Sequence, residues 1–186
     1  MFAPGGRIVL REITASELDT DLIVYWRNTR TARDSFFSKE VVTPDTHRKF
    51  IAGRRPHDLI WMIVVADAPI GVVALTVDVE DHVAEFGRLF IDESARGQEF
   101  GREAVCTTLL YAFGMLRLDQ VYADVYTSNA HALDLYSEVG FAGFPDAQRQ
   151  IVRLVYTDAL WKKRCNEFYE KYGWANAKCL LEKSDE

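Results

Sequence analysis

The residues with the clearest capacity for chemistry lie in a short polar loop, Asp92–Glu99, and at the start of the helix predicted to follow it. The helix begins near Phe100 and Gly101, so its first backbone amides lack an intrahelical partner. These amides and the positive end of the helix dipole favour a bound phosphate. Gly97 and Gly101 let a ligand approach the backbone because they lack a Cβ atom. Arg96 adds a positive charge. Such a loop is either an anion site or only a tight strand-to-helix connection.

A second candidate is Glu85, in the strand predicted at His82–Ile91. Strict alternation places Glu85 on the same face of this strand as Leu89 and Ile91, with Phe90 on the other face. A carboxylate among apolar neighbours in a central strand needs a partner, because burying an unpaired charge is costly. Glu85 is therefore either one half of a structural ion pair or a general base.

Hydrophobic periodicity predicts the elements that hold these residues. Strands are predicted at Arg7–Glu12, Leu59–Val65, Pro69–Val79, His82–Ile91, Gln120–Tyr126 and Gln148–Val155. Helices are predicted from a cap at Thr14 or Ser16 to about Trp26, at His47–Arg54 after a start at Pro44, from Phe100 to Leu116, at Ala130–Val139 and at Thr157–Tyr172. The absence of a Pro/Gly/Ser-rich linker predicts a single α/β (α+β) domain over residues 1–186, with a core at 7–156 and a C-terminal helical extension at 157–186.

The composition narrows the class of partner. The 186 residues carry a formal net charge of −6, which argues against nucleic acid or an anionic membrane surface as the main partner. Cys106, Cys165 and Cys179 lack the spacing of a zinc site or a disulfide framework, so no metal is expected. No stretch reads as a signal peptide or a membrane-spanning helix, and we therefore expect a cytoplasmic protein.

Two motifs resemble those of the GNAT family of acetyl-CoA-dependent N-acetyltransferases. The first is the strand, loop and helix FGRLFIDESARGQEFGREA. The second is YTSNAHALDLYSEVGF, which is similar to the family's Asn-x-x-Ala-x-x-x-Tyr-x-x-x-Gly-Phe ending. The likeness covers nearly all of Arg7–Tyr156. It implies a GNAT fold, in which helices flank a central, twisted, mixed sheet of about six or seven strands.

The resemblance also implies acetyl-CoA as the cofactor. The strand backbone would hold the pantetheine arm, the loop amides would hold the pyrophosphate, and an asparagine would add a hydrogen bond. The cofactor-binding residues would be Leu89, Phe90, Ile91, Arg96, Gly97, Gln98, Glu99, Phe100, Gly101, Arg102 and Asn129. Glu99 stands where the family commonly has a glycine, which brings a carboxylate near the expected pyrophosphate.

The implied reaction is direct transfer, in which a neutral amine attacks the thioester carbonyl without a covalent enzyme intermediate or a metal. Tyr136 would protonate the leaving thiolate, and Glu85 would accept the amine proton directly or through water. The alternative interpretation of Tyr136 is a packed core aromatic, which the motif makes less attractive.

Two further segments, WRN and THRKF, resemble a bacterial branch that acetylates amino sugars carried on nucleotides. This likeness would place Trp26, Arg27, His47 and Phe50 at the acceptor site, although each also has an ordinary structural interpretation. The alternatives are an N-terminal acetyltransferase of the ribosomal-protein type, another small-amine acetyltransferase, and a non-catalytic acyl-CoA-binding module. A small-molecule amine acceptor, with a nucleotide-sugar as the specific candidate, is the expected partner, and the apolar stripe of the last helix is compatible with a homodimer.

Overall fold

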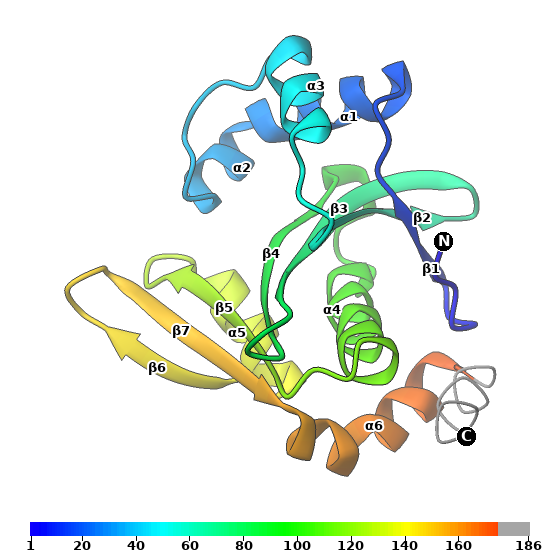
Figure 1. Ribbon diagram of the computed structural model, residues 1–186, viewed down its shortest axis with the longest axis vertical. Coiled ribbons are helices and arrows are strands. Elements are labelled where there is room, and N and C mark those ends of the chain that lie inside the picture. Colours follow the sequence, from blue (N-terminus) through cyan, green and yellow to red (C-terminus); the bar gives the residue numbers. More distant parts are fainter. Residues whose placement is uncertain (175–186) are drawn as a thin grey trace.

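The computed structural model describes residues 1–174, in which seven strands form one sheet in the order β1-β2-β3-β4-β5-β7-β6 (Figure 1). The strands are β1 (Ile8–Glu12), β2 (Asp58–Val65), β3 (Ala68–Asp78), β4 (Val83–Ile91), β5 (Gln120–Tyr126), β6 (Ala142–Asp146) and β7 (Ile151–Thr157). The helices are α1 (Glu17–Asn28), α2 (Arg30–Ser35), α3 (Pro44–Ala52), α4 (Phe100–Leu110), α5 (Ala130–Val139) and α6 (Asp158–Tyr172). Neighbouring strands are antiparallel except β4 and β5, which are parallel and joined through α4. The predicted mixed sheet flanked by helices is confirmed.

The side chains of the sheet divide between two hydrophobic cores. Along β2, Trp61 and Ile63 belong to the core that contains α4, while Ile60 and Met62 belong to the core that contains residues of α1. This division follows from the alternation of side chains along a strand. Figure 1 shows α1, α2 and α3 together on one side of the molecule and α4 on the other. We call these two sides of the sheet the α1–α3 face and the α4 face.

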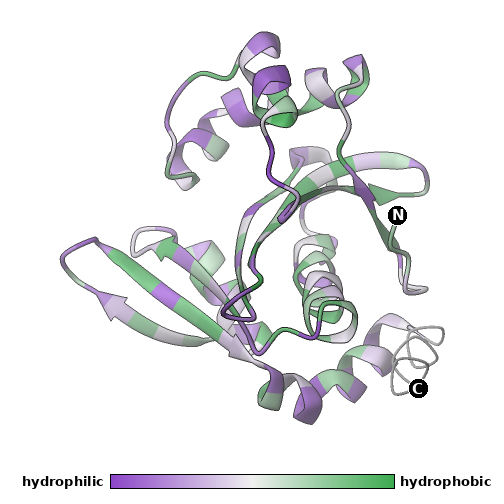
Figure 2. Ribbon diagram, in the orientation of Figure 1, coloured by the Kyte–Doolittle hydropathy of each residue, from purple (hydrophilic) through white to green (hydrophobic). Residues whose placement is uncertain are grey.

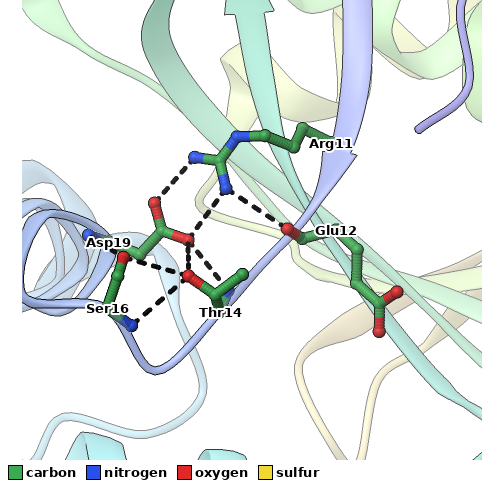
Figure 3. A network of polar contacts seen from close by, with 5 residues as sticks. All are labelled: Arg11, Glu12, Thr14, Ser16 and Asp19. Atoms are coloured by element: carbon green, nitrogen blue, oxygen red, sulfur yellow. Dashed lines mark hydrogen bonds and ion pairs between the residues drawn. The ribbon is translucent and has the colours of Figure 1, made fainter.

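A polar network fixes the start of α1 to β1 (Figure 3). The buried carboxylate of Asp19 accepts two bonds from the Arg11 guanidinium, at 2.7 and 3.0 Å, and two from the backbone and hydroxyl of Thr14, each at 2.8 Å. Burial opposes ionisation of Asp19, but these hydrogen bonds more than offset it and lower the pKa of this carboxyl. Ser16 caps the helix by accepting from the Asp19 amide at 3.3 Å. The network therefore sets the direction of α1, which carries candidate acceptor-site residues at its other end.

The C-terminal part covers the α4 face. Trp161, Phe168 and Tyr169 of α6 are buried in the same core as α4. Figure 2 shows hydrophobic residues concentrated along the strands, whereas turns and the exposed sides of helices are hydrophilic. Within residues 1–174, no helix has the length and apolar character needed to span a bilayer. Cys179 and the end of the predicted C-terminal extension lie outside the described residues.

Candidate active site

The strand β4 contains an irregularity that decides which residues reach the site. Ala74 pairs with Gly87, but Val72, two residues earlier on β3, pairs with Phe90, three residues later on β4. This extra residue is a β-bulge, and Arg88 within it has a φ of +56°. The alternation of β4 side chains between the two faces therefore changes register at the bulge.

The bulge overturns the face assignment that strict alternation predicts. Phe86 lies in the α4 core and Phe90 in the core under α1, so these two rings are on opposite faces. Leu89 and Ile91 pack against the α4 core, whereas Glu85 lies between Ala84 and Phe86 and points to the α1–α3 face. The prediction that Glu85 shares a face with Leu89 and Ile91 is wrong. Glu85 is also exposed, so it is not the buried carboxylate that the apolar pattern indicated.

The ladder between β4 and β5 ends close to Glu85. These strands pair only at three positions, and the last pair is Glu85 with Tyr122. Beyond it the two strands diverge, as Figure 1 shows. The later residues of β4, Phe86–Ile91, therefore have no ladder on their β5 side. Such a strand segment can pair with the amide groups of an extended ligand.

The predicted phosphate loop lies directly after β4 and leads into α4. It contains two residues with positive φ, Gly97 at +76° and Glu99 at +63°. No side chain caps the N-terminus of α4, so the first amides of the helix remain available to an anion. A Cβ atom on Gly101 would lie 3.8 Å from both Ile91 and Leu135, so the helix start adjoins β4 and α5. The structure thus brings the predicted strand and loop residues together.

Arg7 and Glu103 hold this loop in place. The buried carboxylate of Glu103 accepts from the backbone and the guanidinium of Arg7, both at 2.7 Å, and from the Ile8 amide at 3.3 Å. The Arg7 guanidinium also donates to the Gln98 carbonyl at 3.1 Å and lies 4.6 Å from the centre of the Phe100 ring. These contacts join β1, the loop and the first turn of α4.

The carboxylate of Glu99 is engaged by cations. It pairs with Arg102 at 2.7 Å and with Lys171 of α6 at 3.4 Å. Arg102 also pairs with Glu138 of α5. The positive φ of Glu99 gives a conformational reason for glycine at this place, because glycine adopts that conformation without a steric penalty.

Asn129 and Tyr136 occupy the start and the middle of α5. The Asn129 side-chain carbonyl caps the helix by accepting from the Ala132 amide at 3.2 Å. Tyr136 is buried, with edge contacts to Phe86 at 5.7 Å and Phe141 at 5.3 Å between ring centres. Burial raises the pKa of the Tyr136 phenol well above its usual value, so the phenol keeps its proton at neutral pH. Its contact with Phe86 places it beside the end of the β4–β5 ladder.

The candidate acceptor residues lie on the α1–α3 face. Trp26 is buried, packs 6.0 Å from the Phe90 ring and donates from its indole to Asp92 at 2.8 Å. Trp26 thus supports the end of β4. His47 is buried and its ring lies 6.5 Å from that of Phe50, which is exposed. Desolvation lowers the pKa of His47, so the imidazole is neutral at physiological pH.

Sequence reasoning missed several residues around the site. Tyr122 reaches the α1–α3 face because it alternates with the buried Val121 and Ala123 of β5, and Arg88 reaches that face within the bulge of β4. Arg7 and Lys171 contact the loop from segments far away in the chain. The only sequence signal for Arg88 is its place within the strand motif FGRLFI, where alternation predicts that Arg88 and Phe90 lie on the same face of the strand.

Comparison with known proteins agrees with this geometry. The family model described as an acetyltransferase (GNAT) domain matches residues 7–142. A spermidine N-acetyltransferase from Vibrio cholerae, solved with CoA and spermine, superposes with a TM-score of 0.72 at 23% identity, covering 84% of this chain and 98% of that one. A domain from Methanocaldococcus jannaschii has a TM-score of 0.70 at 19% identity, covering 82% of this chain and 99% of that one. The chain belongs to the GNAT family of acetyltransferases, and it is an N-acetyltransferase that uses acetyl-CoA.

Proposed function

We propose that the protein transfers the acetyl group of acetyl-CoA directly to the primary amine of a small molecule, with Glu85 as general base and Tyr136 as general acid. The observation that carries the proposal is the position of these residues at the end of the β4–β5 ladder. Glu85 is half of its last pair and points to the α1–α3 face. Tyr136 contacts Phe86, the next residue along β4, whose side chain points to the α4 face.

This arrangement separates the two proton transfers. On the α1–α3 face, Glu85 accepts the proton of the attacking amine directly or through one water molecule. On the other face, the protonated Tyr136 phenol donates to the leaving thiolate. A backbone amide of β4 beyond the ladder stabilises the negative charge that develops on the thioester oxygen. The loop amides between Arg96 and Arg102, with the side chain of Asn129, hold the cofactor.

The acceptor that we propose first is an amino sugar carried on a nucleotide. Arg27 and His47 on the α1–α3 face supply polar groups for an anionic acceptor, and the exposed Phe50 ring supplies a stacking surface. A polyamine is the second candidate, because several structural neighbours are spermidine N-acetyltransferases. One neighbour is described as dodecameric, whereas we propose a homodimer for this chain. Light scattering coupled to size-exclusion chromatography tests this oligomeric state.

An acceptor panel tests this function. Purified protein and acetyl-CoA are incubated with amino-sugar nucleotides, spermidine, spermine and peptides with a free α-amine, and the release of CoA thiol is followed. We expect turnover of an amino-sugar nucleotide and little turnover in the Glu85→Gln variant. Preference for spermidine would support the second candidate. Acetyl-CoA binding without turnover of any amine would instead indicate a binding module.

A further inference from the structure

Two guanidinium groups on the α1–α3 face lack a carboxylate partner. Arg27 lies in the last turn of α1, and Arg88 lies in the β4 bulge. Within residues 1–174, neither guanidinium has a carboxylate at ion-pair distance. The nearby acid Asp58 is already paired with Arg55 at 3.0 Å. The charges of Asp58 and Glu85 favour the protonated form of Arg88 from beyond ion-pair distance, so neither carboxylate occupies the N–H edges of its guanidinium.

Aromatic rings hold both guanidinium groups. The Arg27 guanidinium lies 4.2 Å from the centre of the Phe36 ring and donates to the Ser38 carbonyl at 3.4 Å. The Arg88 guanidinium lies 4.8 Å from the centre of the Phe50 ring. A ring that covers one side of a guanidinium leaves its N–H edges free for a planar, charged ligand group. The two arginines are thus pre-oriented without being neutralised.

The backbone and the electrostatics show that this arrangement has a cost. Arg88 adopts a left-handed conformation, which costs a non-glycine residue about 1 kcal/mol. Partial desolvation, and then the charge of Arg88, lower the pKa of Arg27. Arg88 keeps accessible surface, yet atoms of neighbouring elements surround its guanidinium closely enough that desolvation lowers its pKa too. A bound anion would offset the repulsion that Arg88 exerts on Arg27.

A buried histidine adds an independent observation. His47 has 4% of its surface exposed, and its Nε2 atom has no hydrogen-bond partner among the described residues. Its ring neighbours Phe50, the ring that carries the Arg88 guanidinium. A buried polar atom without a partner is costly, and a ligand that reaches it removes that cost.

We propose that Arg27 and Arg88 bind an anionic group, a phosphate or a carboxylate, on the same acceptor molecule whose amine Glu85 deprotonates. Arginine recognises both oxyanions through paired hydrogen bonds. Glu85 and Arg88 are three residues apart on β4 and both point to the α1–α3 face, so one small molecule can reach both. The inference rests on the proposed function and makes it more specific. It disfavours polyamines, whose distributed positive charge would be repelled by two unneutralised arginines.

Three acceptors with the same amine test the inference. Glucosamine carries no anion, glucosamine 6-phosphate carries a phosphate, and muramic acid carries a carboxylate. We expect kcat/KM to be higher for at least one anionic sugar than for glucosamine, and the better sugar identifies the oxyanion. Arg27→Gln and Arg88→Gln should each lower kcat/KM for that sugar by about 10- to 100-fold, mainly through KM. They should affect glucosamine much less, because it offers no anion.

Arg33→Gln is the matched control. Arg33 is an exposed arginine of α2 with no ion pair to a described residue, and its loss should leave the ratio between charged and uncharged sugars unchanged. Arg88→Lys keeps the charge but not the paired hydrogen bonds, and it should recover only part of the lost activity. Equal use of all three sugars by the wild type would overturn the inference. An equal loss for charged and uncharged sugars in both arginine variants would also overturn it.

Binding measurements separate this inference from the proposed reaction. Calorimetry of glucosamine 6-phosphate and muramic acid is carried out with CoA present and requires no turnover. Binding of either sugar that depends on Arg27 and Arg88, without acetylation of any amine, would support the anion site and refute the proposed function. Acetylation that is insensitive to both arginines would support the function and refute the anion site.

Discussion

Replacing Glu99 with glycine tests how the phosphate-binding loop is assembled. Glycine removes the left-handed strain at this residue, a gain of about 1 kcal/mol. It also removes ion pairs with Arg102 and Lys171, but the Glu99 side chain is 51% exposed, so each pair contributes only about 0.5 kcal/mol. The gain and the loss nearly cancel. We expect the free energy of unfolding to change by less than about 1 kcal/mol.

The effect on cofactor affinity should be larger than the effect on stability. The substitution removes one negative charge beside the proposed pyrophosphate site and releases Arg102 and Lys171 from it. A unit charge about 7 Å away contributes about 1 kcal/mol at an effective dielectric constant of about 50. Acetyl-CoA should therefore bind about 5-fold more tightly at low salt. The gain should shrink at high salt, because the Debye length falls to about 3 Å in 1 M salt.

Glu99→Gln separates charge from backbone conformation. Glutamine removes the charge but keeps the left-handed strain, so this variant should gain affinity and lose about 1 kcal/mol of stability through its lost ion pairs. Calorimetry with acetyl-CoA at two salt concentrations and urea unfolding measure the two quantities. Weaker binding in both variants would refute the reasoning and show that the carboxylate organises the loop.

Four further substitutions test other parts of the site. Gly101→Val should retain the fold, since its Cβ meets only ordinary contacts, but abolish acetyl-CoA binding in calorimetry; unchanged affinity would remove the loop assignment. Tyr136→Phe should lower kcat by about 10- to 1,000-fold with unchanged cofactor affinity, and wild-type turnover would make it a packing residue. Glu85→Gln should lower kcat/KM most near neutral pH and recover partly at high pH, where the amine deprotonates unaided; parallel pH profiles would exclude it as the base. Asp19→Asn should cost about 1.5–3 kcal/mol of unfolding free energy at pH 7. Because folding lowers the pKa of Asp19, its contribution to stability is present above about pH 4 and is lost as pH falls through the folded pKa. Urea unfolding should therefore show a difference in stability between wild type and Asp19→Asn that shrinks in acid.

The sequence predicted elements best where the periodic signal was strong and local. The predicted limits of Gln120–Tyr126 and Ala130–Val139 agree with β5 and α5. The strand β6 was missed because it is exposed, contains Gly143 and Pro145, and has no alternation to reveal it. Its extended form depends on pairing with β7. The predicted strand at Gln148–Val155 begins too early because residues 147–150 form the turn between β6 and β7. The helix α2 was missed because six residues are too few to show a helical period.

The site shows a different limit of sequence reasoning. The motif indicated which residues meet, but the alternation of side chains along β4 gave the wrong face for Glu85, because no local signal shows the bulge at Arg88. The bulge has a functional consequence under the proposed mechanism. If β4 kept its sequence but alternated strictly, Phe90 would leave its place beside Trp26. The residues after Phe90 would also exchange faces relative to Glu85. With the bulge, β4 presents Glu85, the proposed base, to the α1–α3 face. After the bulge, the same strand presents Ile91 to the first turn of α4. Deleting Arg88 would restore regular pairing and leave Phe90 and Ile91 on their present faces, so acetyl-CoA binding should persist while acceptor binding loses the Arg88 guanidinium.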